Sequence, residues 1–217
     1  MNNIIKLVKL SYNNLLAIKK FPIFIVSIFC LSSIFNPTFS VMLIGMITFV
    51  TAYQTMAYED TYGIDYFIAY APVTRKEYVA SRYLFGILMT IVACIVFSLV
   101  YFISFKFNLM EYRIIDYKTN LSLGIVISVV LISISIPVLL YLGIKKARMA
   151  MTVIFMIVVM IPSMGVMSAE ESETIRKIID TIGNMNSNLV LLIFVAVILS
   201  ISYVVSNTLY LKKEIKE

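Results

Sequence analysis

Long stretches without a charged residue, separated by short charged segments, are the dominant pattern of the chain. The first stretch lies between Lys20 and Glu59 and holds 38 residues, interrupted only by Asn36-Pro37. A helix that rises about 1.5 Å per residue crosses about 30 Å of hydrocarbon in roughly 20 residues. The runs are continuously apolar, whereas the strands of a membrane barrel alternate. The pattern predicts an all-α polytopic membrane protein with six transmembrane helices, at about residues 21–36, 38–57, 83–104, 120–142, 149–167 and 188–210.

The first 20 residues have an amphipathic pattern instead. Apolar residues occupy one face of a helical projection, and the other face carries Lys6, Lys9 and Asn13. Such a helix lies in the membrane interface, with its lysines at the headgroups. Two interpretations of residues 1–20 stay open. The helix is either a simple topology anchor or a lever that joins the first span at Phe21-Pro22.

The composition excludes a soluble globular protein. The chain is 61% hydrophobic and 14% charged, with a mean hydropathy of +0.96, against roughly 45–50% and about 25% in ordinary domains. It contains no histidine, and both cysteines, Cys30 and Cys94, lie inside apolar runs. These residues offer no Cys/His metal cluster and no Ser-His or Cys-His catalytic pair. We therefore expect one transmembrane domain over residues 1–217, with no catalytic, metal or cofactor site, that serves transport, binding or assembly.

Lysine and arginine predict the orientation of the chain in the membrane. Of 18 such residues, 13 fall in one set of predicted loops and 5 in the other. This bias places both termini in the cytoplasm and the protein in a cytoplasmic membrane. The formal charge of +6 then belongs to a surface that faces anionic lipids, and it does not indicate nucleic-acid binding.

The predicted cytoplasmic segment, residues 58–82, is longer than a link between two spans requires. Thr74 and Glu77 have the spacing of a capping box, which predicts that a helix begins at Thr74. The part before Pro72 is rich in aromatic residues: Tyr62, Tyr66, Phe67 and Tyr70. Aromatic patches with charged rims are typical of protein interfaces. The segment therefore predicts a docking surface, with a loop that holds its tyrosines at headgroup depth as the alternative.

This segment resembles the intracellular loop of type-2 ATP-binding-cassette (ABC) exporter permeases, of the small six-span bacterial kind. An acidic stretch with a glycine precedes a short coupling helix and the string Pro72-Val-Thr-Arg-Lys-Glu77, although Ala71 stands where leucine is usual. The resemblance implies a homodimer, or a dimer with a close paralogue, and two copies of an ATPase that binds ATP and Mg. It assigns the contact with that ATPase to Glu59, Asp60, Gly63, Asp65, Tyr66, Phe67, Pro72, Thr74, Arg75 and Glu77.

The chain offers no energy source of its own. It lacks the glycine-rich loop with Gly-Lys-Ser/Thr that cradles nucleotide phosphates. No ionisable residue lies inside the uncharged runs, whereas ion-coupled carriers usually hold such residues at depth. Uphill transport would therefore depend on a partner subunit.

Polar residues and methionines mark a possible substrate path. The second predicted span carries Thr48, Thr51 and Gln54, and the fifth carries Met156, Met160 and Met164 on one face. Methionine adapts to varied apolar ligands, but helix packing or lipid contact explains these positions as well. An uncharged path suits amphipathic cargo, with peptide preferred to lipid or drug. Residues 168–187 are predicted to form an external helical segment, because glutamates crowd its start and Gly183 fits its end.

Two alternatives remain at this level. One is the six-span substrate-binding subunit of an energy-coupling-factor importer, which has a similar size but needs a polar vitamin pocket. The other is a non-transporting membrane protein of immunity or assembly. The capped segment 58–82 and the amphipathic N-terminus favour the exporter over the importer.

Overall fold

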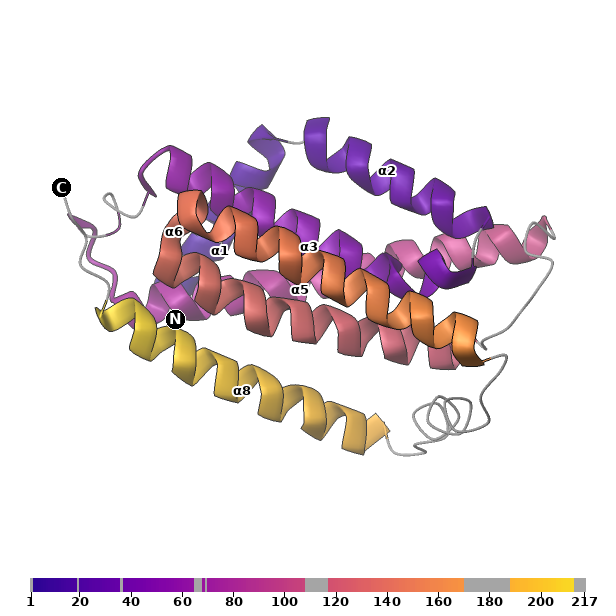
Figure 1. The fold of residues 1–217 in the computed structure, drawn as a ribbon. Coiled ribbons are helices and arrows are strands. Elements are labelled where there is room, and N and C mark those ends of the chain that lie inside the picture. Colours follow the sequence, from indigo (N-terminus) through magenta and orange to yellow (C-terminus); the bar gives the residue numbers. More distant parts are fainter. Residues whose placement is uncertain are drawn as a thin grey trace.

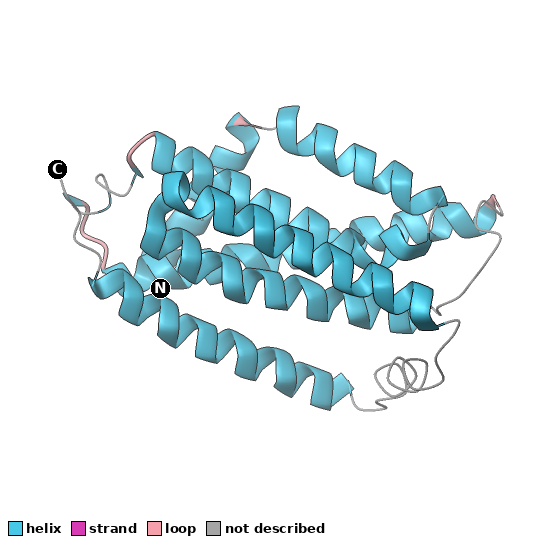
Figure 2. Ribbon diagram, in the orientation of Figure 1, coloured by secondary structure: helices cyan, strands magenta, loops and turns pink. Residues whose placement is uncertain are grey.

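The computed structural model describes residues 2–18, 20–35, 37–64, 68, 70–107, 117–169 and 188–212. For residues 2, 35, 37, 38, 158–169, 188–191 and 212 it describes the backbone alone. Every regular element in these ranges is helical (Figure 2), which confirms the all-α prediction. The helices are α1 (Asn2–Ala17), α2 (Lys20–Phe35), α3 (Pro37–Thr61), α5 (Arg75–Lys106), α6 (Tyr117–Ala169) and α8 (Asn188–Lys212). The predicted external segment falls largely outside the described residues.

Four of these helices contain stretches long and apolar enough to cross a membrane. The stretches are Phe39–Thr61, Arg75–Lys106, Tyr117–Ile157 and Leu192–Leu211. A fifth candidate is the bent pair formed by α1 and α2, whose axes differ by 79°. A polytopic membrane protein is therefore confirmed, and the count of six spans stays a prediction.

Helix α6 consists of two arms that meet at Gly143. This glycine has φ 70° and ψ 164°, which interrupts the helical backbone and is a conformation that only glycine adopts without strain. The first arm (residues 117–142) and the second arm (residues 144–169) run side by side in opposite directions (Figure 1). The sequence suggested a connection of several residues here. The structure needs only one, because helix resumes at Ile144.

Proline and asparagine separate α2 from α3 as the sequence predicted. Helix α2 ends at Phe35 and α3 begins at Pro37. Proline is favoured at the start of a helix, because the amide hydrogen that it lacks would have no partner within the helix there. Pro22 lies in the first turn of α2 for the same reason. The two helices form a hairpin along the bundle (Figure 1).

Helix α3 is the centre of the bundle and packs against α2, α5 and α6. Small residues bring it close to the first arm of α6. A Cβ atom at Gly45 would lie 2.7 Å from Ile127 Cγ2, and one at Gly124 would lie 2.7 Å from Ile44 Cδ1. Such close approach maximises dispersion contact where no hydrophobic force acts between helices in lipid.

One end of the bundle gathers most of the polar connections. Helix α1, the end of α3, the start of α5, the turn at Gly143 and the end of α8 all lie there (Figure 1). We call it the Gly143 end. The segments that the charge pattern assigned to the cytoplasm meet at this end, and their orientation in a membrane stays a prediction.

Candidate functional site

An ion pair between Glu59 and Arg82 is buried at the Gly143 end. Glu59 lies in the last turns of α3 and Arg82 in the first turns of α5, so the two residues stand before and after the segment that joins these helices. Arg82 Nη1 lies 2.7 Å from Glu59 Oε1, and each side chain is 2% exposed or less. Removing charges from water is costly, so such a pair persists only with good geometry and further hydrogen bonds.

Helix α1 supplies two of those hydrogen bonds. Asn14 Nδ2 donates to Glu59 Oε1 at 3.1 Å, and Ser11 Oγ donates to the same oxygen at 3.4 Å. Arg82 also donates to Ser11 Oγ. The face of α1 that carries Leu7, Ser11 and Asn14 is therefore attached to the bundle, while Ile5, Tyr12 and Leu16 stay exposed. The exposed apolar face fits the predicted interfacial helix.

Tyr78 completes this cluster from α5. Its hydroxyl donates to Glu59 Oε2 at 3.5 Å, and its ring lies under the Arg82 guanidinium, 4.3 Å from Cζ to the ring centroid. The ion pair and its partners thus join α1, α3 and α5. We call Ser11, Asn14, Glu59, Tyr78 and Arg82 the Glu59 cluster.

Further bonds attach the residues beside this cluster to α6 and α8. Asp60 Oδ2 accepts from the Ile144 amide at 3.1 Å, where the second arm of α6 begins. A carboxylate at a helix N-terminus satisfies a free amide and complements the helix dipole. Arg75 Nη1 donates to the Leu211 carbonyl at 3.1 Å, at the end of α8. Asn3 of α1 also donates to the Pro72 carbonyl at 3.3 Å.

The predicted capping box is present at the start of α5. The Glu77 amide donates to Thr74 Oγ1 at 3.3 Å, and the Thr74 amide donates to Glu77 Oε2 at 2.9 Å. Helix α5 begins at Arg75, with Thr74 as its N-cap. On the other side of the segment, Gly63 turns the chain after α3 with φ 64°.

Aromatic side chains project from the segment. Tyr62 is 68% exposed and Tyr70 is 82% exposed, whereas Ile68 is buried. Pro72 and Thr74 are exposed as well. Asp65, Tyr66 and Phe67, which the sequence also assigned to this surface, lie outside the described residues. Among the predicted contact residues, Glu59 is buried within the Glu59 cluster and does not lie on the surface.

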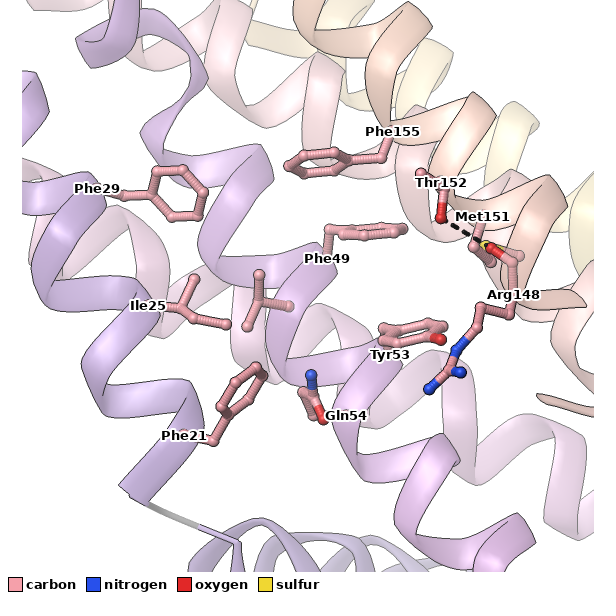
Figure 3. Close-up of a pocket in the computed structure, with 11 residues that line it drawn as sticks. Phe21, Ile25, Phe29, Phe49, Tyr53, Gln54, Arg148, Met151, Thr152 and Phe155 are labelled. Carbon is pink, nitrogen blue, oxygen red and sulfur yellow. Dashed lines mark hydrogen bonds between the residues drawn. The ribbon is translucent and has the colours of Figure 1, made fainter. Parts of the chain in front are cut away.

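A cleft of about 460 Å³ opens between α2, α3 and the second arm of α6 (Figure 3). Its lining comes from all three: Phe21, Ile25, Phe29, Phe49, Val50, Tyr53, Gln54, Arg148, Met151, Thr152 and Phe155. Phe49 stacks on Phe155, with ring centroids 5.1 Å apart. The lining of the cleft is mostly apolar and rich in aromatic rings, with its polar groups toward the Gly143 end.

The predicted substrate-path residues separate into three groups. Gln54 lines the cleft. Thr48 and Thr51 are buried, and their hydroxyls donate to the Ile44 and Ile47 carbonyls of their own helix. Met156 is 60% exposed on the outside of the bundle, and the side chains of Met160 and Met164 are not described. Of the predicted path residues whose side chains are described, Gln54 is the one in the lining of this cleft.

Sequence reasoning missed Arg82, Ser11 and Asn14. Arg82 was counted only toward orientation, although it is the last charge before an apolar run, just as Glu59 is the first charge after one. Ser11 and Asn14 carried a usable signal, since with Leu7 they repeat every three to four residues on one helical face. Within the described ranges, no group of three or more His, Cys, Asp or Glu side chains could hold a metal ion.

Comparison with known proteins gives one match. The family model described as ABC-2 family transporter protein matches residues 9–211, nearly the whole chain. The matched region contains the Glu59 cluster, the segment between α3 and α5, and the cleft. No curated protein and no solved structure matches the chain significantly.

Proposed function

The chain belongs to the ABC-2 family of transporter proteins, and on this premise we propose that it is the membrane subunit of an ATP-driven exporter. Family membership makes the protein a transport permease and implies an ABC ATPase partner. It also disfavours the energy-coupling-factor alternative. The direction of transport, the cargo and the number of subunits are the content of the proposal.

We propose six spans: α2, α3, α5, the two arms of α6, and α8. The apolar stretch of 41 residues in α6 would extend about 60 Å as one straight helix, twice the hydrocarbon thickness. The reversal at Gly143 supports two spans instead. The Gly143 end then faces the cytoplasm, with both termini on that side of the inner membrane, because the basic loops gather there.

The observation that carries the proposal is the set of bonds around the segment between α3 and α5. Residues 59, 60, 72, 75 and 82 bond to α1, α6 or α8, while Tyr62 and Tyr70 stay exposed beside them. A partner that moves these tyrosines would move the segment that carries them, and the bonds of that segment would pass the displacement to α1, α6 and α8. We propose that the ATPase docks here, that two permease and two ATPase subunits assemble, and that ATP and Mg bind in the ATPase.

We propose an amphipathic cargo, with peptide preferred to lipid or drug. The uncharged runs offer no side chain to neutralise an ionic solute, whose desolvation without partners would cost several kcal/mol. Export outward from the cytoplasm or inner leaflet follows from the resemblance to exporter permeases.

Docking is tested by replacing the two exposed tyrosines. Tyr62→Ala with Tyr70→Ala should abolish copurification of an ATPase activity from native membranes, because anchoring aromatics are frequent interface hot spots. Phe107→Ala is the matched control, since Phe107 is 65% exposed at the opposite end of α5. Retention of the ATPase by the double variant would place the docking site elsewhere. A wild-type permease that purifies without any ATPase would contradict the proposed function itself.

Cargo and direction are tested in cells that lack the permease. Amphipathic peptides should accumulate inside these cells and slow growth, and the wild-type gene should reverse both effects. Uptake of small hydrophilic solutes by the reconstituted permease and ATPase would show that both the direction and the cargo class are wrong.

A further inference from the structure

The cleft between α2, α3 and the second arm of α6 has a polar end and an apolar end. Phe21 and Phe29 are eight residues apart on α2, a length of about 12 Å along the helix axis. Arg148 lies on the second arm one turn after Ile144, at the Gly143 end, and Phe155 lies two turns further along. Figure 3 shows the Arg148 side chain directed toward Tyr53 and Gln54, with Phe29 and Phe155 at the far end.

Arg148 brings a positive charge to the polar end. Its side chain is exposed, and no salt bridge to it is found within the described ranges, where Glu59 pairs with Arg82. Guanidinium groups bind phosphate oxygens through two parallel hydrogen bonds. The other polar groups in the lining are Tyr53, Gln54 and Thr152, whose hydroxyl donates to the Arg148 carbonyl.

The outer wall of the cleft has an exposed apolar face. Helix α2 turns Phe21, Ile25 and Phe29 toward the cleft, while Ile23, Phe24 and Leu31 on its other side are 58–64% exposed. A helix with this exposed apolar face in a membrane protein borders the bilayer. Phe21, which lines the cleft, is itself 52% exposed, so a bilayer lipid can reach the cleft beside α2.

We infer that the cleft holds one anionic phospholipid of the surrounding bilayer. Arg148 contacts the phosphate, and an acyl chain lies along Phe29, Phe49 and Phe155. The order of groups matches a lipid that stands in its own leaflet, since the cation lies at the end of the bundle and the rings lie about 10 Å deeper. Basic pockets between transmembrane helices bind anionic headgroups by this chemistry. The inference needs only the membrane placement of the chain and is independent of its cargo.

The experiment compares phosphatidylglycerol with phosphatidylcholine of the same acyl chains. Bound lipid on the purified, detergent-solubilised protein is measured by native mass spectrometry. The wild type should prefer phosphatidylglycerol, and Arg148→Gln should weaken its binding about tenfold, the loss of about 1.4 kcal/mol. Arg148→Lys should retain part of the preference. Lys146→Gln is the control, because Lys146 is an exposed cation two residues away that does not line the cleft.

Other outcomes would overturn the inference. Equal binding of phosphatidylglycerol by Arg148→Gln and the wild type would show that Arg148 does not contact the phosphate. An equal loss of binding in Lys146→Gln would show that any basic surface suffices. Binding of free glycerol phosphate as tight as that of the lipid would show an anion site without an acyl chain. Tighter binding of an anionic amphipathic peptide would assign the cleft to cargo. Ile25→Trp, which fills the cleft without changing its charge, should exclude the lipid, and undiminished binding would place the acyl chain elsewhere.

Discussion

Arg82 and Arg148 lie at the same end of the bundle in opposite surroundings. Arg82 is 2% exposed, pairs with Glu59 at 2.7 Å and lies over the Tyr78 ring. Arg148 is exposed at the rim of an aromatic cleft. Sequence reasoning treated both as equivalent basic residues of cytoplasmic loops. Their surroundings separate an arginine that holds three helices together from one that is available to a ligand.

The difference follows from the groups that replace water around each guanidinium. In place of water, the Arg82 guanidinium contacts a carboxylate, a hydroxyl and an aromatic face. The stability of the fold therefore depends on all of these groups together. Arg148 kept its access to solvent and headgroups, so its removal leaves no buried group unsatisfied. Substitutions at the first site should therefore change stability, and substitutions at the second should change binding.

Breaking the buried pair should have the largest effect. Arg82→Met leaves the Glu59 carboxylate buried without its cation, which should lower the free energy of unfolding by about 3–5 kcal/mol. The double variant Glu59→Gln with Arg82→Met should recover most of this loss, because no buried charge remains. Thermal unfolding in detergent, followed by the helical circular dichroism signal, measures both. A double variant as unstable as the single one would contradict this account of the cluster.

Detaching α1 should have a smaller effect. Asn14→Leu removes a hydrogen bond to a carboxylate and should lower stability by about 1–2 kcal/mol. Asn13→Leu is a matched control, because Asn13 is exposed one position earlier on the same helix. We expect the control to stay within about 0.5 kcal/mol of the wild type in the same unfolding measurement. Equal losses in the two variants would show that the Asn14 bond to Glu59 is not what matters.

Removing the cap on the second arm of α6 should cost about 1 kcal/mol. Asp60→Ala leaves the Ile144 amide without its acceptor. Asp60→Asn should retain most of the stability, since asparagine caps helices about as well as aspartate. Circular dichroism melts of the two variants decide between capping and a purely electrostatic role. If Asn were as destabilising as Ala, the negative charge and not the acceptor would be the important feature.

The smallest change in stability is expected at the cleft. Arg148→Gln should alter the free energy of unfolding by less than about 0.5 kcal/mol in a detergent free of anionic lipid. The same variant should lose the extra thermal stability that added phosphatidylglycerol gives the wild type, because ligand binding stabilises the folded state by mass action. A large loss of stability without lipid would remove the contrast with Arg82.

Local patterns were sufficient for much of the fold. The helix boundary at Asn36-Pro37 and the capping box of Thr74 and Glu77 were correct from the sequence, because both depend on backbone groups within a few residues. The apolar runs also predicted four helices that are long and apolar enough to cross a membrane, because bilayer thickness sets the length that such a helix needs. The position of the turn at Gly143 was less evident, because the helix that follows it is capped by Asp60, which bonds to the Ile144 amide from 84 residues earlier.

The tertiary structure alone decided which polar residues meet. Ser11, Glu59 and Arg82 come from three helices separated by long stretches of chain, and no periodicity in any one helix indicates that they converge. The cleft likewise exists only where α2, α3 and the second arm of α6 diverge. Hydropathy is a property of each segment, so the sequence determined which segments are apolar enough to cross a membrane. Pairing of charges and the space between helices depend on packing, so only the assembled bundle separates Arg82 from Arg148.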